Sequence, residues 1–135
     1  MKLKDMKGGE FLKEILNEDE PIYIQIAKGI EDEILQGELI EEMQIPSTNE
    51  LAKWYQINPA TVLKGINLLV EREILYKKRG IGMFVMRGAT QTIKEARKES
   101  FKMIVMSQLF QEAKKLGISK QELMDMIQNS EEMDR

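Results

Sequence analysis

Residues 45–62 read IPSTNELAKWYQINPATV and contain two helix start signals a few residues apart. Ser47 and Glu50 form an S-x-x-E capping box, in which the two side chains satisfy backbone amides that the first helical turn leaves free. Asn58 and Pro59 form the second signal, because Asn caps helices and Pro fits the first helical position. Two helices joined by so short a turn cannot lie parallel, so the stretch predicts a helix-turn-helix. We expect its helices over residues 48–55 and 59–73.

An amphipathic helix is expected before this motif. Ile22, Ile26, Ile30 and Ile34 recur every four residues, a spacing that predicts a helix over residues 21–36 with the isoleucines facing the core. The third helix is expected to add further core residues, namely Val62, Ile66, Leu69 and Val70. At the end of the second helix, Trp54 and Tyr55 are expected to be packing residues.

The period of the sequence changes after the motif. Residues 74–77 and 83–86 are rich in aliphatic and aromatic side chains, and residues 78–82 between them contain two glycines. This pattern predicts a strand, a turn and a second strand. A β-hairpin directly after a helix-turn-helix is a wing, so we predict a mainly α fold with a small β wing.

The C-terminal part is expected to form two helices. The capping box Thr92-Ile93-Lys94-Glu95 predicts the start of a long helix that ends at Gly117, and Ser119-Lys120-Gln121-Glu122 predicts the start of a last helix. Their many Met, Ile and Leu side chains are more apolar surface than two helices hide alone, which favours pairing with a second copy. We therefore expect an N-terminal appendage with a short helix (1–20, helix 10–16), a winged helix-turn-helix domain (21–87) and a helical dimerisation segment (88–135).

Charge is distributed unevenly along the chain. The net charge is -3, yet residues 53–89 carry seven basic and two acidic side chains, whereas residues 21–52 carry one and seven. A basic stretch within an acidic protein is typical of a surface for a charged partner. The sequence has no Cys or His, which removes the usual metal ligands, thiol nucleophiles and the commonest general base. We expect no enzyme activity, cofactor, metal site or membrane segment, and a cytoplasmic location.

These features together predict a protein that binds double-stranded DNA. The second helix of the motif would enter the major groove with its first turn, where Asn58, Ala60 and Thr61 approach base edges. Lys64 and the hairpin lysine Lys78 would meet phosphates, while Arg79 would reach the minor groove at a tip that Gly80 leaves unobstructed. The expected DNA-binding residues are Ser47, Asn49, Asn58, Ala60, Thr61, Lys64, Lys78, Arg79 and Gly80.

Five blocks of the chain also resemble a known family. They read PIYIQIA (21–27), QGEL (36–39), IPSTNELA (45–52), INPATV (57–62) and RGIGMFV (79–85), and their order and spacing are similar to the DNA-binding domain of GntR-family bacterial transcription regulators. The short two-helix tail resembles the YtrA-like subfamily. The resemblance implies a homodimer that binds a pseudo-palindromic operator, often as a repressor, with dimerisation through the tail.

The chain departs from the family pattern at several positions. Asn49 stands where the family commonly has a DNA-contacting arginine, Leu63 stands where a polar or basic residue is frequent, and Glu41-Glu42 replace a usual Pro-Gly. Ile81 and Met83 alter the wing. These departures imply an atypical operator site, and they leave open a dimeric winged-helix adaptor that binds protein rather than DNA. Whether a small effector exists is not indicated by the sequence.

Overall fold

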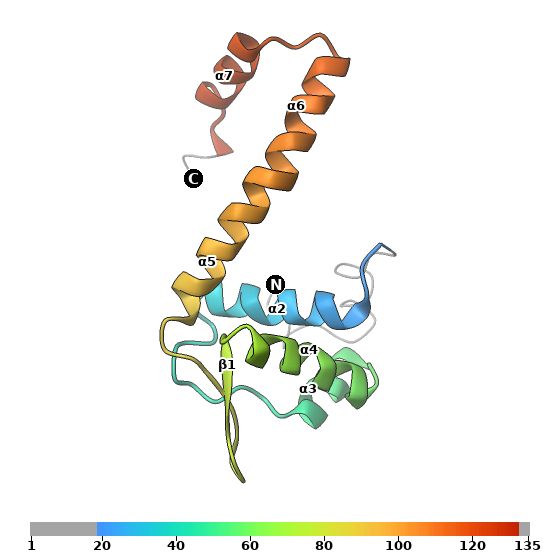
Figure 1. Ribbon diagram of the computed structural model, residues 1–135, viewed down its shortest axis with the longest axis vertical. Helices are drawn as coiled ribbons and strands as arrows, with labels where there is room; N and C mark the ends of the chain where they lie inside the picture. The colour runs from blue at the N-terminus through green and yellow to red at the C-terminus, as the bar shows by residue number, and fades with distance from the viewer. Residues whose placement is uncertain (1–18, 133–135) are drawn as a thin grey trace. The chain divides into compact units, whose positions relative to one another are not determined.

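The computed structural model describes residues 19–132, so the predicted helix over residues 10–16 lies outside the described residues (Figure 1). The described part is mainly helical with one antiparallel two-stranded sheet, as the sequence predicts. Its elements are α2 (Ile22–Leu35), α3 (Thr48–Tyr55), α4 (Pro59–Glu71), β1 (Leu75–Lys78), β2 (Gly82–Val85), α5 (Ala89–Ser100), the π-helical segment η2 (Phe101–Val105), α6 (Met106–Lys115) and α7 (Lys120–Gln128).

The described residues divide into two compact units, with the boundary between Lys94 and Glu95. The sequence-based boundary after Arg87 therefore lies seven residues before the structural one. The reason is that Ala89 and Ile93, one helical turn apart at the start of α5, have no exposed surface and belong to the core of the first unit. An apolar pair at this spacing adds a buried helical face to the first unit.

Helices α2 and α4 form the centre of the first unit. The predicted core residues Ile26, Ile30 and Ile34 are buried, as are Val62, Ile66 and Leu69 on α4. The predicted core residue Val70 is only half-buried and packs against this core. Ile22 is different: it is 41% exposed, because it lies in the first turn of α2. A Cβ placed on Gly65 of α4 would lie 2.8 Å from the backbone oxygen of Tyr23. The two helices therefore approach so closely that the contact requires a glycine.

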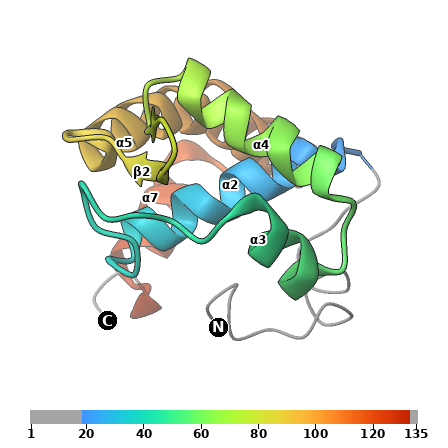
Figure 2. The same cartoon turned by 90° about the horizontal axis from the view of Figure 1, so that it is seen from below.

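The helix-turn-helix forms as predicted from α3 and α4 (Figure 2). Both halves of the capping box are present: Ser47 Oγ accepts from Glu50 N at 3.1 Å, and Glu50 Oε1 accepts from Ser47 N at 3.3 Å. Helix α3 ends at a left-handed Gln56, and α4 begins after Asn58. The predicted end of α4 at Glu73 is two residues too late, since Glu73 itself has a φ of 61° and cannot continue the helix.

The hairpin pairs Tyr76 with Phe84 and Lys78 with Gly82. Its strands lie within one residue of the predicted positions. Residues 42–45, expected only as a connection, run along β2 and hydrogen-bond to it: Val85 N donates to Met43 O, and Ile45 N donates to Met83 O, both at 2.9 Å. The hairpin therefore has backbone support from the segment that leads into α3.

The second unit begins within a continuous helical stretch. The predicted capping box at Thr92 is wrong, because α5 begins at Ala89 and the Thr92 hydroxyl instead donates to Gly88 O at 3.2 Å within the first turn. The helical stretch continues through η2 and α6, and ends before Gly117, which has a φ of 70° as expected of a helix stop. Ser119 caps α7 by accepting from Glu122 N at 3.1 Å, as predicted.

Candidate nucleic-acid interface

All nine expected DNA-binding residues belong to the first unit, on α3, α4, their caps and the hairpin. Eight of them are exposed and Thr61 is half-buried. In Figure 1 the hairpin extends to the same side of α2 as α3 does. The exposed basic side chains of this region include Lys53, Lys64, Arg72, Lys77, Lys78 and Arg79. Exposed cations on the motif and the hairpin are what a phosphate-binding surface requires.

Two of the expected residues already cap helices. Asn58 Oδ1 accepts from Ala60 N at 2.8 Å, and Ser47 Oγ accepts from Glu50 N at 3.1 Å. Each side chain still has a donor that these bonds do not use: the Asn58 amide NH₂ and the Ser47 hydroxyl proton. Both residues can therefore donate to a phosphate or a base acceptor while they keep their helix start in place.

The first turns of α3 and α4 carry the smaller side chains of the site. Asn49 lies in the first turn of α3 and lines a shallow hollow together with Lys53, Ile57 and Pro59. Ala60 follows Pro59 at the start of α4, and Thr61 comes next with a half-buried side chain. The first turn of α4 thus presents no bulky group. This geometry allows the turn to approach a groove closely.

Aromatic rings hold two of the expected phosphate-binding lysines. Lys64 Nζ lies 4.2 Å from the ring centroid of Tyr23 on α2. Lys78 Nζ lies 4.3 Å from the Phe84 ring and 5.9 Å from that of Tyr76, and these two rings stack at 5.7 Å. Cation–π contacts of this kind restrict a flexible ammonium group without removing its charge. Sequence reasoning missed the three aromatic residues as part of the site.

The signals for these aromatic partners differ. Tyr76 and Phe84 could have been found from the register of the predicted hairpin, because they are cross-strand partners and Lys78, two residues after Tyr76, lies on the same face. Tyr23 gave no such local signal, because it contacts Lys64 only through the packing of α2 on α4.

Arg79 and Gly80 lie in the hairpin turn, which Ile81 N closes by donating to Lys78 O at 3.0 Å. Gly80 takes a φ of 78° there.

The structure shows what the unusual Glu41-Glu42 pair does. Glu41 Oε1 accepts from Gly88 N at 2.6 Å, next to the start of α5, and this hydrogen bond lowers the pKa of the Glu41 carboxyl below its usual value. Glu42 takes a left-handed φ of 69°, and its carboxylate lies 3.7 Å from Arg87 Nε. Both acids therefore connect residues 41–42 to the segment that joins the hairpin to α5.

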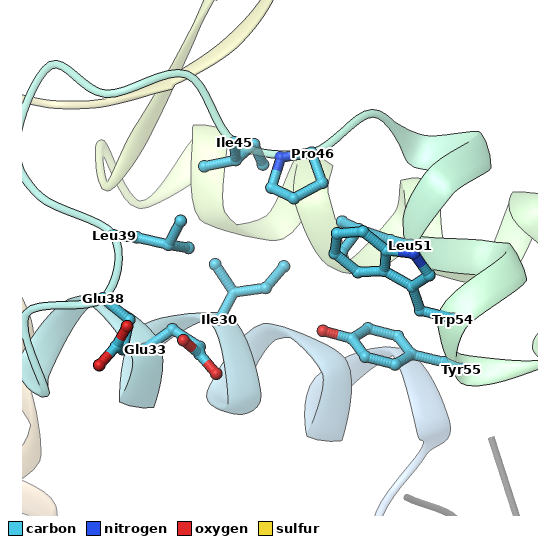
Figure 3. Close-up of a pocket in the computed structure, with 9 residues that line it drawn as sticks. All are labelled: Ile30, Glu33, Glu38, Leu39, Ile45, Pro46, Leu51, Trp54 and Tyr55. Atoms are coloured by element: carbon cyan, nitrogen blue, oxygen red, sulfur yellow. The ribbon is translucent and has the colours of Figure 1, made fainter. Parts of the chain in front are cut away.

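An apolar hollow lies behind the motif, between α2, the connection after it and α3 (Figure 3). Trp54 and Tyr55 line it, and both pack on the core as predicted. Burial, and next the nearby Glu33 carboxylate, raise the pKa of the Tyr55 hydroxyl. The free space within this hollow is about 30 Å³, which holds only one or two water molecules. We therefore regard it as a packing feature of the motif rather than a ligand site.

Within residues 19–132, no three His, Cys, Asp or Glu side chains are arranged to hold a metal ion. Nor is any helix among these residues both long and apolar enough to cross a membrane.

Comparison with known proteins identifies what the chain is similar to. Residues 22–85 match the family model described as "Bacterial regulatory proteins, gntR family". The HTH-type transcriptional repressor NagR of Bacillus subtilis is 37% identical over 67 residues, which make up 50% of this chain and 28% of NagR. The HTH-type transcriptional regulator YhcF of the same species is 29% identical over 107 residues, which make up 79% of this chain and 87% of YhcF.

The chain also resembles solved structures over most of its length. A crystal structure described as a transcriptional regulator of the GntR family from Bacteroides thetaiotaomicron is 38% identical with a TM-score of 0.71, and the match covers 84% of this chain and 99% of that one. The chain thus spans a small part of NagR but most of YhcF and of the Bacteroides protein.

Proposed function

The chain belongs to the gntR family of bacterial regulatory proteins, and from this premise we propose that it represses transcription by binding a pseudo-palindromic operator as a homodimer. The observation that carries the proposal is the exposed first turn of α4 beside a basic hairpin, in a chain whose net charge is -3. This function requires the protein to be in the cytoplasm, because that is where bacterial DNA is.

The first turn of α4 is proposed to read bases. Helix-turn-helix proteins place the N-terminal residues of their second helix in the major groove. Asn58 has a free NH₂ donor, Ala60 offers a methyl group for a thymine methyl, and Thr61 offers a hydroxyl. Ser47 and Asn49, at the start of α3, would contact the sugar-phosphate backbone of the DNA.

The hairpin is proposed to hold the flanking DNA. Lys78, supported on Phe84, would meet a phosphate, and Arg79 at the turn would enter the minor groove, where its charge is attracted most strongly if the groove is narrow. Lys64 would meet a second phosphate from the body of α4. Several cations on each protomer then supply the affinity that does not depend on base sequence.

The second unit is proposed to form the dimer contact, as in the YtrA-like subfamily that its tail resembles. Within the described part of this unit, large apolar side chains are exposed on η2, α6 and α7, among them Met103 at 73% and Ile104 at 56%. Isolated exposed apolar side chains are ordinary, but a set of this size on short helices marks an interaction surface. An isologous contact, in which both copies use the same surface, would present the two copies of α4 to adjacent half-sites of the operator.

Selection of duplex fragments by the purified full chain tests the proposal. We expect enrichment of an inverted repeat with half-sites about one helical turn apart, roughly 34 Å. Titration of the selected duplex between about 50 and 200 mM salt should weaken binding by orders of magnitude. Binding that ignores salt, or no enrichment at all, would contradict the proposal and favour the protein-binding adaptor.

A further inference from the structure

We propose that Gln44 is a positioning residue for DNA binding: its side-chain amide fixes the tip of the hairpin relative to the helix-turn-helix. This role rests on the proposed function, because it concerns how the hairpin is presented to DNA. Gln44 is exposed and lies outside both the hairpin and the helices, in the connection before α3.

The amide contacts the hairpin at its turn. Gln44 Nε2 donates to the backbone oxygen of Ile81 at 3.0 Å. Ile81 directly follows Arg79 and Gly80, and its own N–H closes the turn by donating to Lys78 O at 3.0 Å. The bond therefore joins a residue outside the hairpin to the turn that carries the proposed minor-groove arginine.

The backbone of Gln44 and of the residue after it is paired with β2. Gln44 forms a β-bridge with Phe84, whose ring supports the Lys78 ammonium. Ile45, the next residue, is buried and donates its N–H to Met83 O at 2.9 Å. Ser47 then begins the capping box of α3. The same few residues thus contact both the hairpin turn and the start of the motif. The amide hydrogen bond therefore fixes the position of the hairpin turn relative to the start of α3.

Gly82 supplies a second, independent observation. A Cβ on Gly82 would lie 2.6 Å from Gln44 Nε2, which is closer than real Cβ atoms come to other atoms. Gly82 also has a φ of 149°, a conformation that other residues rarely adopt. The glycine at the start of β2 is therefore what leaves room for the amide to reach Ile81.

The hairpin requires such support because it is short. Each strand has four residues, and a two-stranded hairpin of that length is marginally stable by itself. Residues 42–45 pair with β2 only as far as Met83, so the turn extends beyond that backbone support. A turn that is already directed toward DNA loses less conformational freedom on binding, and this preorganisation raises affinity.

A double-mutant cycle in the full chain tests the role. Gln44→Met keeps the length of the side chain but removes the donor, and we expect it to weaken binding to the selected operator about three- to tenfold, the range of one hydrogen bond. Arg79→Ala should weaken binding in the wild type and have a clearly smaller effect in the Gln44→Met background, because a misdirected tip no longer places the arginine. A merely structural role would not produce this coupling.

Two further variants sharpen the experiment. Gln36→Met makes the same chemical change at an exposed position just after α2 and should bind like the wild type. Gly82→Ala places a Cβ against the Gln44 amide and should also reduce the effect of Arg79→Ala. Thermal melting of each variant checks that the fold is kept.

The outcomes separate this role from the proposed function. Failure of the wild type to bind any duplex would overturn both. If the wild type binds and Arg79→Ala weakens it, but Gln44→Met binds normally or the two effects simply multiply, only the positioning role of Gln44 is overturned. Loss of binding by Gln36→Met to the same degree would also overturn it, since the effect would then not depend on the hairpin contact.

Discussion

Among single residues, Thr61 offers the sharpest test of base reading. Thr61→Val keeps the shape of the half-buried side chain but removes its hydroxyl. We expect the preference at one base step to relax by about 1 to 3 kcal/mol, the value of one good base contact. Binding titrations with operator variants measure this, and Lys78→Ala is the control, because loss of a phosphate contact should weaken all sequences alike. An unchanged preference would show that Thr61 reads no base.

A second residue-scale prediction concerns Gly65. Gly→Ala in a helix normally stabilises by roughly 1 kcal/mol, but here the new Cβ would lie 2.8 Å from the Tyr23 backbone oxygen. Since a backbone atom cannot move aside cheaply, we expect Gly65→Ala to lower the free energy of unfolding by about 1 to 3 kcal/mol. Urea denaturation measures it. Asn67→Ala, at an exposed position of the same helix, should change stability by no more than about 0.5 kcal/mol.

Local chemistry explains which residues were predictable. The roles of Ser47, Glu50 and Asn58 could be read from the sequence, because a cap and its helix are a few residues apart. The contacts of Lys64 with Tyr23 and of Gln44 with Ile81 could not, because each joins segments that only the packed fold brings together.

At the scale of elements, the start of α5 should depend on pH. The hydrogen bond from Gly88 N lowers the pKa of the Glu41 carboxyl below its usual 4.5. A lowered folded-state pKa means that the carboxylate stabilises the fold above the unfolded pKa, and that this contribution is lost as pH falls through the folded value. Wild type should therefore be more stable than Glu41→Gln at neutral pH, and the difference should shrink below about pH 4.5.

Urea denaturation of both proteins across this range measures the difference. Acid effects that arise elsewhere are shared by the two chains and cancel. A stability difference that stays constant from neutral to acidic pH would contradict the role of the Glu41 charge at this helix start.

The boundaries of α5 show why one element was misjudged from sequence. Thr92 and Glu95 have the spacing of a capping box, yet the helix begins at Ala89. The Glu41 carboxylate comes from a distant part of the chain to accept from Gly88 N, and burial of Ala89 and Ile93 favours the earlier start. Tertiary contacts thus overrode a local signal. The caps at Ser47 and Ser119 met no such competition.

At the scale of the whole molecule, the proposed dimer makes a direct prediction. Ile104→Glu places a charge on a side chain that is 56% exposed and is proposed to be buried by a second copy. We expect sedimentation to show a dimer for the wild type and a monomer for the variant, with weaker operator binding and unchanged helix content. Burying an unpaired carboxylate in an apolar contact costs several kcal/mol, which is enough to separate the two states.

Lys102→Gln is the matched control for this experiment. It changes the net charge by the same amount at a neighbouring exposed position, so it should remain dimeric. A dimer that survives Ile104→Glu with full operator affinity would contradict the assignment of the contact to this surface.

The π-helical segment Phe101–Val105 sets the phase of the helix that contains it. A π turn holds nearly one residue more than an α turn, so the side chains of α6 point in directions offset from those that an uninterrupted α-helix would give. Each residue of an α-helix turns the chain by about 100°. Loss of a single residue from this segment, with reversion to an α-helix, would therefore leave the apolar residues of α6 facing nearly the same way relative to Phe101, because the π turn holds that additional residue. The π turn thus lets the helix contain one residue more without changing which face of α6 is apolar.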